Sequence, residues 1–143
     1  MNSQEEEHVT DKSESWRRDF AEEEYAERAR RVREEMERHQ LDAILLTHEP
    51  NIRWLTGYHL LLTGRVKWMV TAVLFPRERS KRSVLLCASD ATGTDLASVD
   101  EVQYWDERSG PPYSRYAQPA SVLKEQIVKR GLGESISPRR YGI

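Results

Sequence analysis

Apolar residues recur at helical spacing within the highly charged segment 20–39. Four of them are separated by four, three and four positions, namely Tyr25, Ala29, Val32 and Met36. Asp19 followed by Glu22 resembles a capping box at the start of this segment. Three glutamates also precede an arginine by four positions, in the pairs Glu24–Arg28, Glu27–Arg31 and Glu34–Arg38. We therefore predict an amphipathic helix over 20–39 whose charged side faces water.

The next segment, LDAILLT at 41–47, is short and almost entirely apolar. Such a run is typical of a strand that helices bury on both faces. Pro50 then stands where the first turn of a helix tolerates proline, and Gly57 offers a C-terminal stop. The pattern predicts a buried strand over 41–47 followed by a short helix over 50–55.

Two apolar segments rich in β-branched residues, 66–75 and 82–87, flank the short polar connection PRERSK. This arrangement predicts two strands that form an antiparallel hairpin. Segment 89–98 either begins a helix capped by Ser89 or is irregular, because Gly93 weakens the helical pattern.

The last part of the chain alternates between strand and helix patterns. VQYW at 102–105 predicts a strand, and SPRRYGI at 137–143 predicts the start of another. Between them a helix is expected from Pro119 to Arg130, closed by Gly131. Its apolar face contains Val122, Leu123, Ile127 and Val128. The whole pattern predicts an α/β fold, with a mixed β-sheet that carries helices on its faces.

Composition adds limits to this picture. The chain is 38% hydrophobic and 32% charged, and its 22 basic and 24 acidic residues leave a net charge of only −2. No global field therefore favours nucleic acid or an anionic membrane. The lone Cys87 cannot form an internal disulfide, and no apolar signal or membrane segment is visible. We expect a cytoplasmic protein in which the acidic residues 1–18 form a disordered tail.

Common catalytic motifs are absent from the sequence: GxGxxG, GxxxxGK[ST], HExxH and GxSxG. His48 and Glu49 are adjacent, but a metal site needs three or more converging ligands, so a polar loop is the better interpretation. Cys87 ends an apolar strand and is expected to be a core residue. The basic cluster RERSKR at 77–82 has no interleaved aromatic residues, so it favours a solvated turn over a nucleic-acid site.

The order of the motifs resembles a known domain. EYAERARRVREEM leads into LDAILLT, EPNIRWLTGY, a pair of apolar strands, a helix and finally RRYGI. Together they resemble the N-terminal domain of the creatinase, prolidase and aminopeptidase P family, the pita-bread metallohydrolases. The resemblance runs from about residue 20 to the last residue. It implies an α/β domain with a ribonuclease H-like motif over 19–143.

The resemblance also implies what surrounds this domain. In the family, a separate C-terminal domain binds the catalytic divalent metal ions, so Mn, Co or Zn is expected there and no metal or catalytic residue is expected in this segment. The chain would then be the non-catalytic part of a hydrolase that acts on Xaa-Pro peptides or a small zwitterionic substrate. Its partners would be its own catalytic domain and a second copy in a homodimer.

Three residues are candidates for substrate binding by this resemblance: Arg65, Tyr58 and His59. Creatinase-like members hold a substrate carboxylate with an arginine shortly after the NIxYLTG segment, and LLTGRVKW places Arg65 at that position. A guanidinium fork binds a carboxylate bidentately. Thr63 departs from the aromatic residue of creatine-binding members. Tyr58 and His59 follow the predicted helix stop, where a loop could face a neighbouring domain.

Other roles remain open at this point. Trp54 and Leu55 are expected to pack the short helix on the sheet. Some pita-bread proteins have no metal and bind peptides or histones, and a lyase on the same scaffold is a further alternative. Five metal ligands beyond Ile143 would favour the hydrolase over the binding protein, and substrate assays would separate the hydrolase from the lyase.

Overall fold

A mixed four-stranded sheet forms the centre of the computed structural model, which describes residues 19–59, 71–88, 91, 93–105 and 117–132. The strands are β1 (Ala43–Leu46), β2 (Ala72–Pro76), β3 (Val84–Ala88) and β4 (Glu101–Trp105). Their spatial order is β1-β2-β3-β4. β1 and β2 pair antiparallel, as do β2 and β3, whereas β3 and β4 pair parallel.

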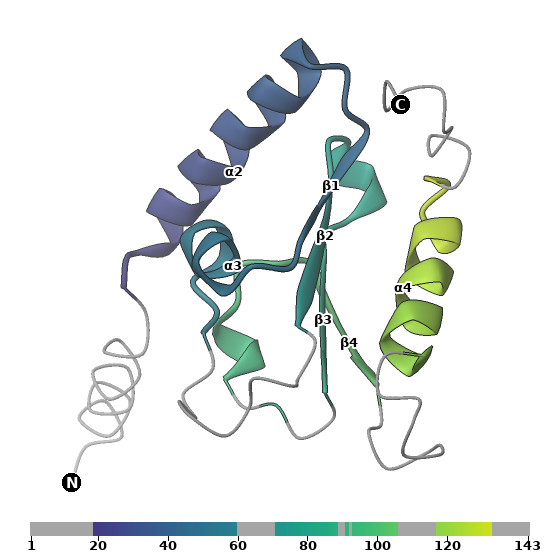
Figure 1. The fold of residues 1–143 in the computed structure, drawn as a ribbon. Coiled ribbons are helices and arrows are strands. Elements are labelled where there is room, and N and C mark those ends of the chain that lie inside the picture. The colour runs from purple at the N-terminus through teal and green to yellow at the C-terminus, as the bar shows by residue number, and fades with distance from the viewer. Residues whose placement is uncertain (1–18, 60–70, 89–90, 92, 106–116, 133–143) are drawn as a thin grey trace, which may run out of the picture.

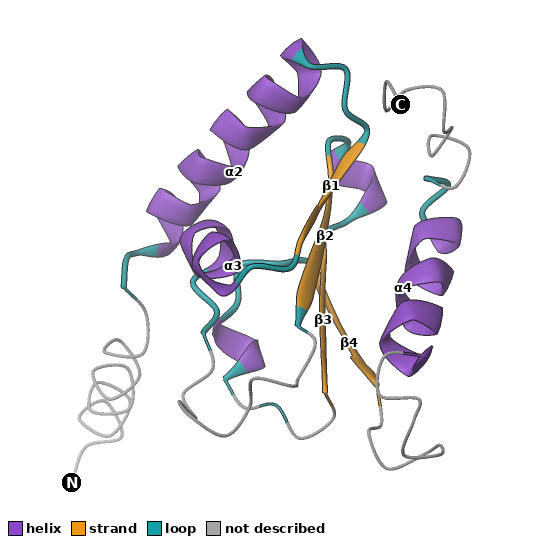
Figure 2. Cartoon of the chain, viewed as in Figure 1, coloured by secondary structure: helices purple, strands orange, loops and turns teal. Residues whose placement is uncertain are grey.

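Helices lie on both faces of this sheet (Figures 1 and 2). They are α2 (Glu22–Arg38), α3 (Glu49–Thr56) and α4 (Ala117–Lys129), and two short 3₁₀ turns are η2 (Arg79–Lys81) and η3 (Thr94–Leu96). α2 and α3 cover one face, and α4 covers the other. The predicted α/β fold with a mixed sheet is therefore confirmed. Within the described ranges, no helix combines the length and apolar character needed to cross a membrane.

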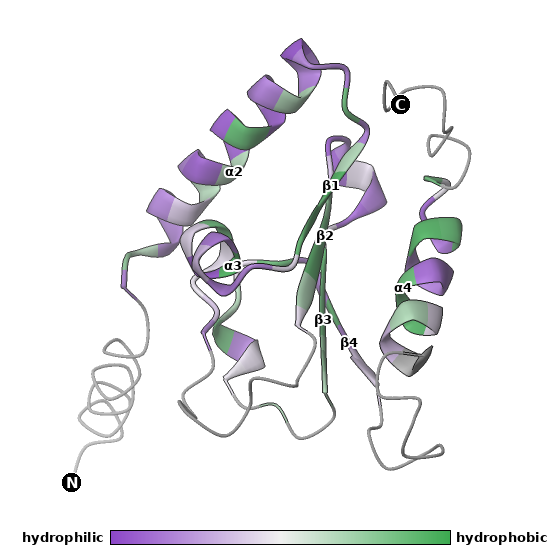
Figure 3. Ribbon diagram, viewed as in Figure 1, coloured by the Kyte–Doolittle hydropathy of each residue, from purple (hydrophilic) through white to green (hydrophobic). Residues whose placement is uncertain are grey.

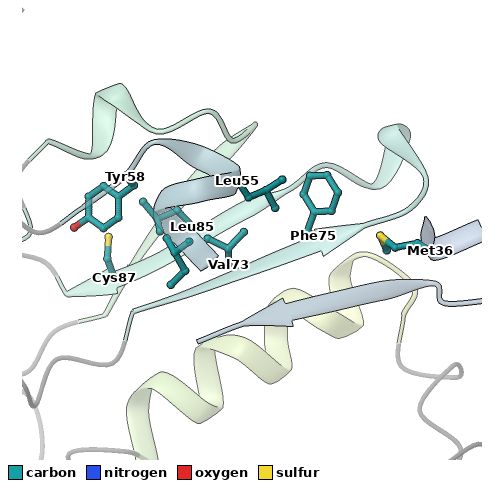
Figure 4. Packing of buried hydrophobic residues seen from close by; sticks show 8 residues of the cluster. Met36, Leu55, Tyr58, Val73, Phe75, Leu85 and Cys87 are labelled. Atoms are coloured by element: carbon teal, nitrogen blue, oxygen red, sulfur yellow. The ribbon is translucent and has the colours of Figure 1, made fainter. Parts of the chain in front are cut away.

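The two central strands supply both halves of the core. On the face under α2 and α3, the fully buried residues of β2 and β3 are Val73, Phe75, Leu85 and Cys87 (Figure 4). On the face under α4 they are Ala72, Leu74, Val84, Leu86 and Ala88. This alternation follows from side chains that point to opposite faces at successive strand positions. Both faces of β2 and β3 are therefore apolar, which Figure 3 shows as continuous green along these strands.

The predicted apolar face of α2 is confirmed. Tyr25 and Met36 are buried, and Ala29 and Val32 pack against the same core. The opposite side of the helix is charged and mostly purple in Figure 3. The hydrophobic face of α2 thus explains its position on the sheet.

The polar contacts of α2 differ partly from the prediction. The capping box is wrong: Ala21 is the N-cap residue, and no side chain caps it. Asp19 instead accepts two hydrogen bonds from Arg53, and Glu22 accepts one from the Ser98 hydroxyl. These long-range partners outcompete the local cap. The first two glutamate–arginine pairs form, at 2.9 and 3.1 Å, whereas Arg38 bonds Glu35 in place of the predicted partner.

β1 corrects a second prediction. We expected the strand at 41–47 to be buried on both faces, but in the described structure β1 is an edge strand that pairs with β2 alone. Leu45 is 44% exposed, because α4 packs against β3 and β4 and leaves β1 uncovered on that side. Ile44 and Leu46 pack against the core on the other face. An apolar run alone therefore did not distinguish an edge strand from a central one.

The predicted hairpin is confirmed, because β2 and β3 are antiparallel neighbours joined through η2. The structure describes β2 from Ala72, so residues 66–70 of the predicted strand lie outside the described residues. Segment 89–98 contains η3 in its described part, with Gly93 at φ 76°, rather than an α-helix. The start of that segment, including Ser89, also lies outside the described residues.

α4 matches the predicted helix to within two residues and ends before Gly131, whose φ is 66°. Val122, Leu123 and Ile127 pack against the core as expected. Val128 is 63% exposed, so its place on the apolar face was wrong. Leu132, just beyond the helix, completes that side of the core. The strand predicted at 137–143 lies outside the described residues.

Candidate functional site

The candidate site begins where α3 ends. Pro50 lies in the first turn of this helix, where its missing N–H has no intrahelical partner to lose. Gly57 closes the helix in the left-handed conformation, at φ 76°, and its N–H donates to the Arg53 carbonyl at 2.8 Å. The predicted short helix and its glycine stop are therefore confirmed. Gly57 thus sets the point at which the chain leaves α3.

Thr56 holds this exit in place. Its buried hydroxyl donates to the Ile52 carbonyl at 2.7 Å and accepts from the Tyr58 N–H at 3.1 Å. The Thr56 carbonyl accepts from the N–H of Ser98 at 2.8 Å, which joins the end of α3 to the segment after η3. Hydrogen bonds on both sides thus fix the backbone from which Tyr58 and His59 extend.

Tyr58 points into the core rather than into a loop. It is 2% exposed and lies beside Cys87 in Figure 4. Its hydroxyl is buried and has no hydrogen-bond partner within the described part of the chain. Burial raises the pKa of Tyr58 to about 12, so the ring stays neutral at physiological pH. Its role in substrate binding remains a prediction, now for a residue that also packs the core.

His59 follows directly and is half-buried, with its Nδ1 3.4 Å from the Gly57 carbonyl oxygen. Tyr58 and His59 therefore lie together at the end of α3. Arg65, the third candidate, lies outside the described residues. The proposed grouping of all three remains a prediction.

Sequence reasoning missed Arg28 as the residue that fastens α3 to α2. Its side chain is 10% exposed, and it donates to the Trp54 carbonyl at 2.8 Å and to Glu24 at 2.9 Å. Its guanidinium carbon also lies 4.4 Å from the centroid of the Phe20 ring and 5.1 Å from that of Trp54. Such cation–π contacts favour a planar guanidinium. The sequence did contain a signal for this role, because Arg28 lies beside the apolar residues Tyr25 and Ala29 on the buried side of the predicted helix.

Trp54 does not pack α3 on the sheet, contrary to our expectation. It is 47% exposed and contacts Arg28 on the outer side, whereas Leu55 is buried as predicted. Ile52 takes the second packing position, since it lies on the same side of α3 as Leu55 and is 2% exposed. A three-residue spacing, rather than adjacent positions, defines the buried side of a short helix.

Arg53 forms the outer polar contact of α3. It donates from Nε and Nη2 to the two carboxylate oxygens of Asp19, at 2.7 and 2.9 Å. The hydrogen bond from Arg53 lowers the pKa of Asp19. Both side chains are well exposed, so this pair contributes at most about 1 kcal/mol to stability. The main contribution of this ion pair is to position the two helices, because it joins Asp19, just before α2, to Arg53 on α3.

The described residues contain no group of three or more His, Cys, Asp or Glu side chains that could hold a metal ion. His48 is the N-cap residue of α3, and Glu49 lies in its first turn. The described residues therefore do not offer the converging set of ligands that a divalent metal needs.

Cys87 is a core residue, as the sequence predicted. It is fully buried in the cluster beside Tyr58, and burial raises the pKa of its thiol to about 12. The nucleophilic form of cysteine is the thiolate. At pH 7–9 this thiol is therefore both protonated and inaccessible.

We expect a thiol reagent at pH 8 to label Cys87 in the folded protein at least about a hundredfold more slowly than in denaturant, because labelling requires opening of the core. Mass spectrometry of timed aliquots measures the rate. The reagent's reaction with free cysteine in each solvent corrects for the effect of denaturant on the chemistry. Comparable rates in the two states would contradict the buried position.

The comparisons with known proteins agree with the fold. The family model described as the Creatinase/Prolidase N-terminal domain matches residues 28–138. This range begins at Arg28 and includes every described strand, α3 and α4. A search of the curated proteins finds no match to the chain. The chain belongs to the creatinase/prolidase N-terminal domain family.

Proposed function

We propose that this domain is the non-catalytic N-terminal part of a metal-dependent hydrolase of the Xaa-Pro peptidase or creatinase type. In this role it shapes the substrate pocket and contributes to a homodimer interface, while a separate catalytic domain supplies divalent metal chemistry. The observation that carries the proposal is the family match over residues 28–138.

The geometry of α3 supports a positioning role. Pro50 and Gly57 set the two ends of the helix, and Arg28 and Thr56 anchor it to neighbouring elements. The segment that leaves this anchored helix leads within eight residues from Gly57 to Arg65. A rigid element that presents a binding segment reduces the ordering cost of holding a substrate.

The chain itself provides the first test. Residues 1–143 alone should show no turnover of Xaa-Pro peptides with added Mn²⁺, Co²⁺ or Zn²⁺. Turnover should appear when the catalytic domain is also present. Release of free amino acid, measured by chromatography, reports the activity. Metal-dependent turnover by the 143 residues alone would overturn the proposed division of labour.

Arg65 provides the second test. In the protein that also carries the catalytic domain, Arg65→Ala should lower kcat/KM by more than about tenfold, because a guanidinium that binds the substrate carboxylate is lost. Steady-state kinetics measures the change. Arg38→Ala is the matched control, since Arg38 is a surface arginine on α2 whose side chain is 71% exposed. Equal kinetics for the two variants would assign Arg65 to the solvated surface.

A further inference from the structure

The outer edge of β1 is open within the described part of the chain, because β1 pairs with β2 alone. At the start of this pairing the Arg77 N–H donates to the Asp42 carbonyl at 2.9 Å. Hydrogen-bonded and non-hydrogen-bonded pairs alternate along an antiparallel ladder, so the N–H and C=O groups of Ala43 and Leu45 point away from β2. The strand sequence, AILL, has no charged residue or proline of the kind that commonly protects an exposed edge.

An apolar side chain is exposed at the same place. Leu45 lies opposite Leu74, which belongs to the core face under α4. Residues that lie opposite each other share a face of the sheet, so Leu45 points to the α4 side. However, α4 packs against β3 and β4, and Leu45 is 44% exposed. The open edge and the uncovered apolar face therefore meet on β1.

The other edge of the described sheet, β4, is better covered. Trp105 lies opposite Ala88 on the α4 side and is only 4% exposed. Tyr104 is exposed on the other side, but its hydroxyl lies 2.8 Å from that of Thr94 and forms a hydrogen bond with it. Of the two edges, β1 is thus the one that leaves apolar surface uncovered.

α4 brings the chain to the end of the sheet at which β1 begins. Arg130, just after α4, donates to the Arg82 carbonyl at 2.8 Å and to Glu101, close to the starts of β3 and β4. β2 is antiparallel to both of its neighbours, so β1, β3 and β4 run in the same direction (Figure 1). A strand that starts near the end of α4 would therefore run parallel to β1.

We propose that the segment 137–143, which lies outside the described residues, pairs in parallel with β1 and covers Leu45. Its sequence, SPRRYGI, favours a strand in which Tyr141 and Ile143 share one side, because side chains alternate along a strand. Pro138 suits the start of such a strand, where a missing N–H is tolerated. The position beyond β1 is about 14 Å from β3, and the six residues 133–138 can span about 20 Å.

This pairing also determines where the segment ends. A parallel neighbour of β1 finishes at the same end of the sheet as β1, which leads through His48 into α3. Ile143 then lies near the start of the helix whose other end carries the candidate site. The inference rests on the described edge and face of β1, and it does not depend on the function proposed above.

NMR of the 143-residue chain tests the pairing directly. We expect contacts between the backbone protons of β1 and those of residues 139–143. The amides of Ala43 and Leu45 should exchange with solvent at least about a hundredfold more slowly than in an unstructured chain. Contacts of the segment with β4 in place of β1, or exchange of both amides at the unstructured rate, would overturn the proposal.

Two proline variants make the test specific. Tyr141→Pro removes an N–H from the proposed strand and should speed exchange of the Leu45 amide by at least about tenfold, whereas the Leu85 amide in the central strand β3 keeps its rate. Glu134→Pro is the matched control, because it places proline in the connection before the strand and should leave Leu45 protected. Equal losses of protection in the two variants would contradict the proposal. If Tyr141→Pro does not fold by circular dichroism, the contacts in the parent chain decide the question.

A second copy of the chain is the competing occupant of this edge. Pairing between copies would make the protection of Leu45 increase with protein concentration, whereas pairing within one chain does not depend on concentration. We expect equal exchange rates at two concentrations about tenfold apart. Protection that grows with concentration and persists in Tyr141→Pro would assign the edge to a second copy and overturn the proposal.

Discussion

Arg130→Ala is expected to lower the free energy of unfolding by about 3 kcal/mol, because it removes a buried cation on which several groups depend. The Arg130 side chain is 4% exposed and lies 2.5 Å from Glu101. It also donates to the Arg82 carbonyl at 2.8 Å and to the amide oxygen of Gln126 at 2.5 Å. Its loss leaves the buried Gln126 without this donor and detaches the end of α4 from the sheet. Chemical denaturation followed by circular dichroism measures the change.

Arg82→Ala is the matched control for this prediction. Arg82 pairs with the same carboxylate, Glu101, at 3.4 Å, but its side chain is 59% exposed. Exposed ion pairs contribute about 0–1 kcal/mol, so this variant should unfold at nearly the same denaturant concentration as the parent. If the two substitutions lower the free energy of unfolding equally, then the burial and the extra hydrogen bonds of Arg130 do not contribute to stability. Glu101 keeps one arginine partner in each variant, so the comparison isolates the environment of the arginine.

Arg130 also shows where sequence reasoning reached its limit. The helix that precedes it was predicted from its apolar spacing, and Gly131 was predicted as its stop, because both signals are local. The contacts of Arg130 join residues 29 and 48 positions apart. No periodicity in the sequence encodes such a pairing. A charged residue beside the apolar face was visible, but its partner was not.

The errors in the fold have the same origin. The apolar run of β1 correctly indicated a strand, yet whether a strand is central or at an edge depends on which elements neighbour it in space. Leu45 on β1 is exposed because α4 packs against β3 and β4, at the opposite edge of the sheet. Trp54 was misplaced for a related reason, since the cation on Arg28, 26 positions earlier, holds it on the outer surface. Tertiary partners decide these cases, and local propensity does not.

The candidate site was predictable in part. Pro50 and Gly57 identified both ends of α3, so the position of Tyr58 and His59 after the helix followed from the sequence. The direction of the Tyr58 side chain did not, because the strand residue that it contacts, Cys87, lies 29 positions later. The core position of Cys87 was predicted correctly, because a free cysteine in an apolar strand behaves as a small hydrophobic residue.

Gly57→Ala is expected to destabilise the fold by about 2–5 kcal/mol, through two separate effects. Gly57 has φ 76°, a conformation in which a side chain is strained. A Cβ atom at this position would also lie 2.8 Å from Cζ and 2.9 Å from Oη of Tyr25. Tyr25 belongs to α2 and is only 1% exposed, so its ring cannot move aside without disturbing the buried residues around it. The end of α3 would therefore separate from α2, and the segment after it would lose its fixed starting point.

Gly131→Ala separates the two effects. Gly131 has a similar φ of 66°, but among the described residues nothing lies within 4 Å of a Cβ built there. This variant should cost only the backbone strain, about 1–2 kcal/mol. The difference between the two variants, measured by chemical denaturation, is then the energy of the contact with Tyr25. Equal costs would mean that the close approach of α3 to α2 contributes nothing, and that Gly57 is required for its backbone conformation alone.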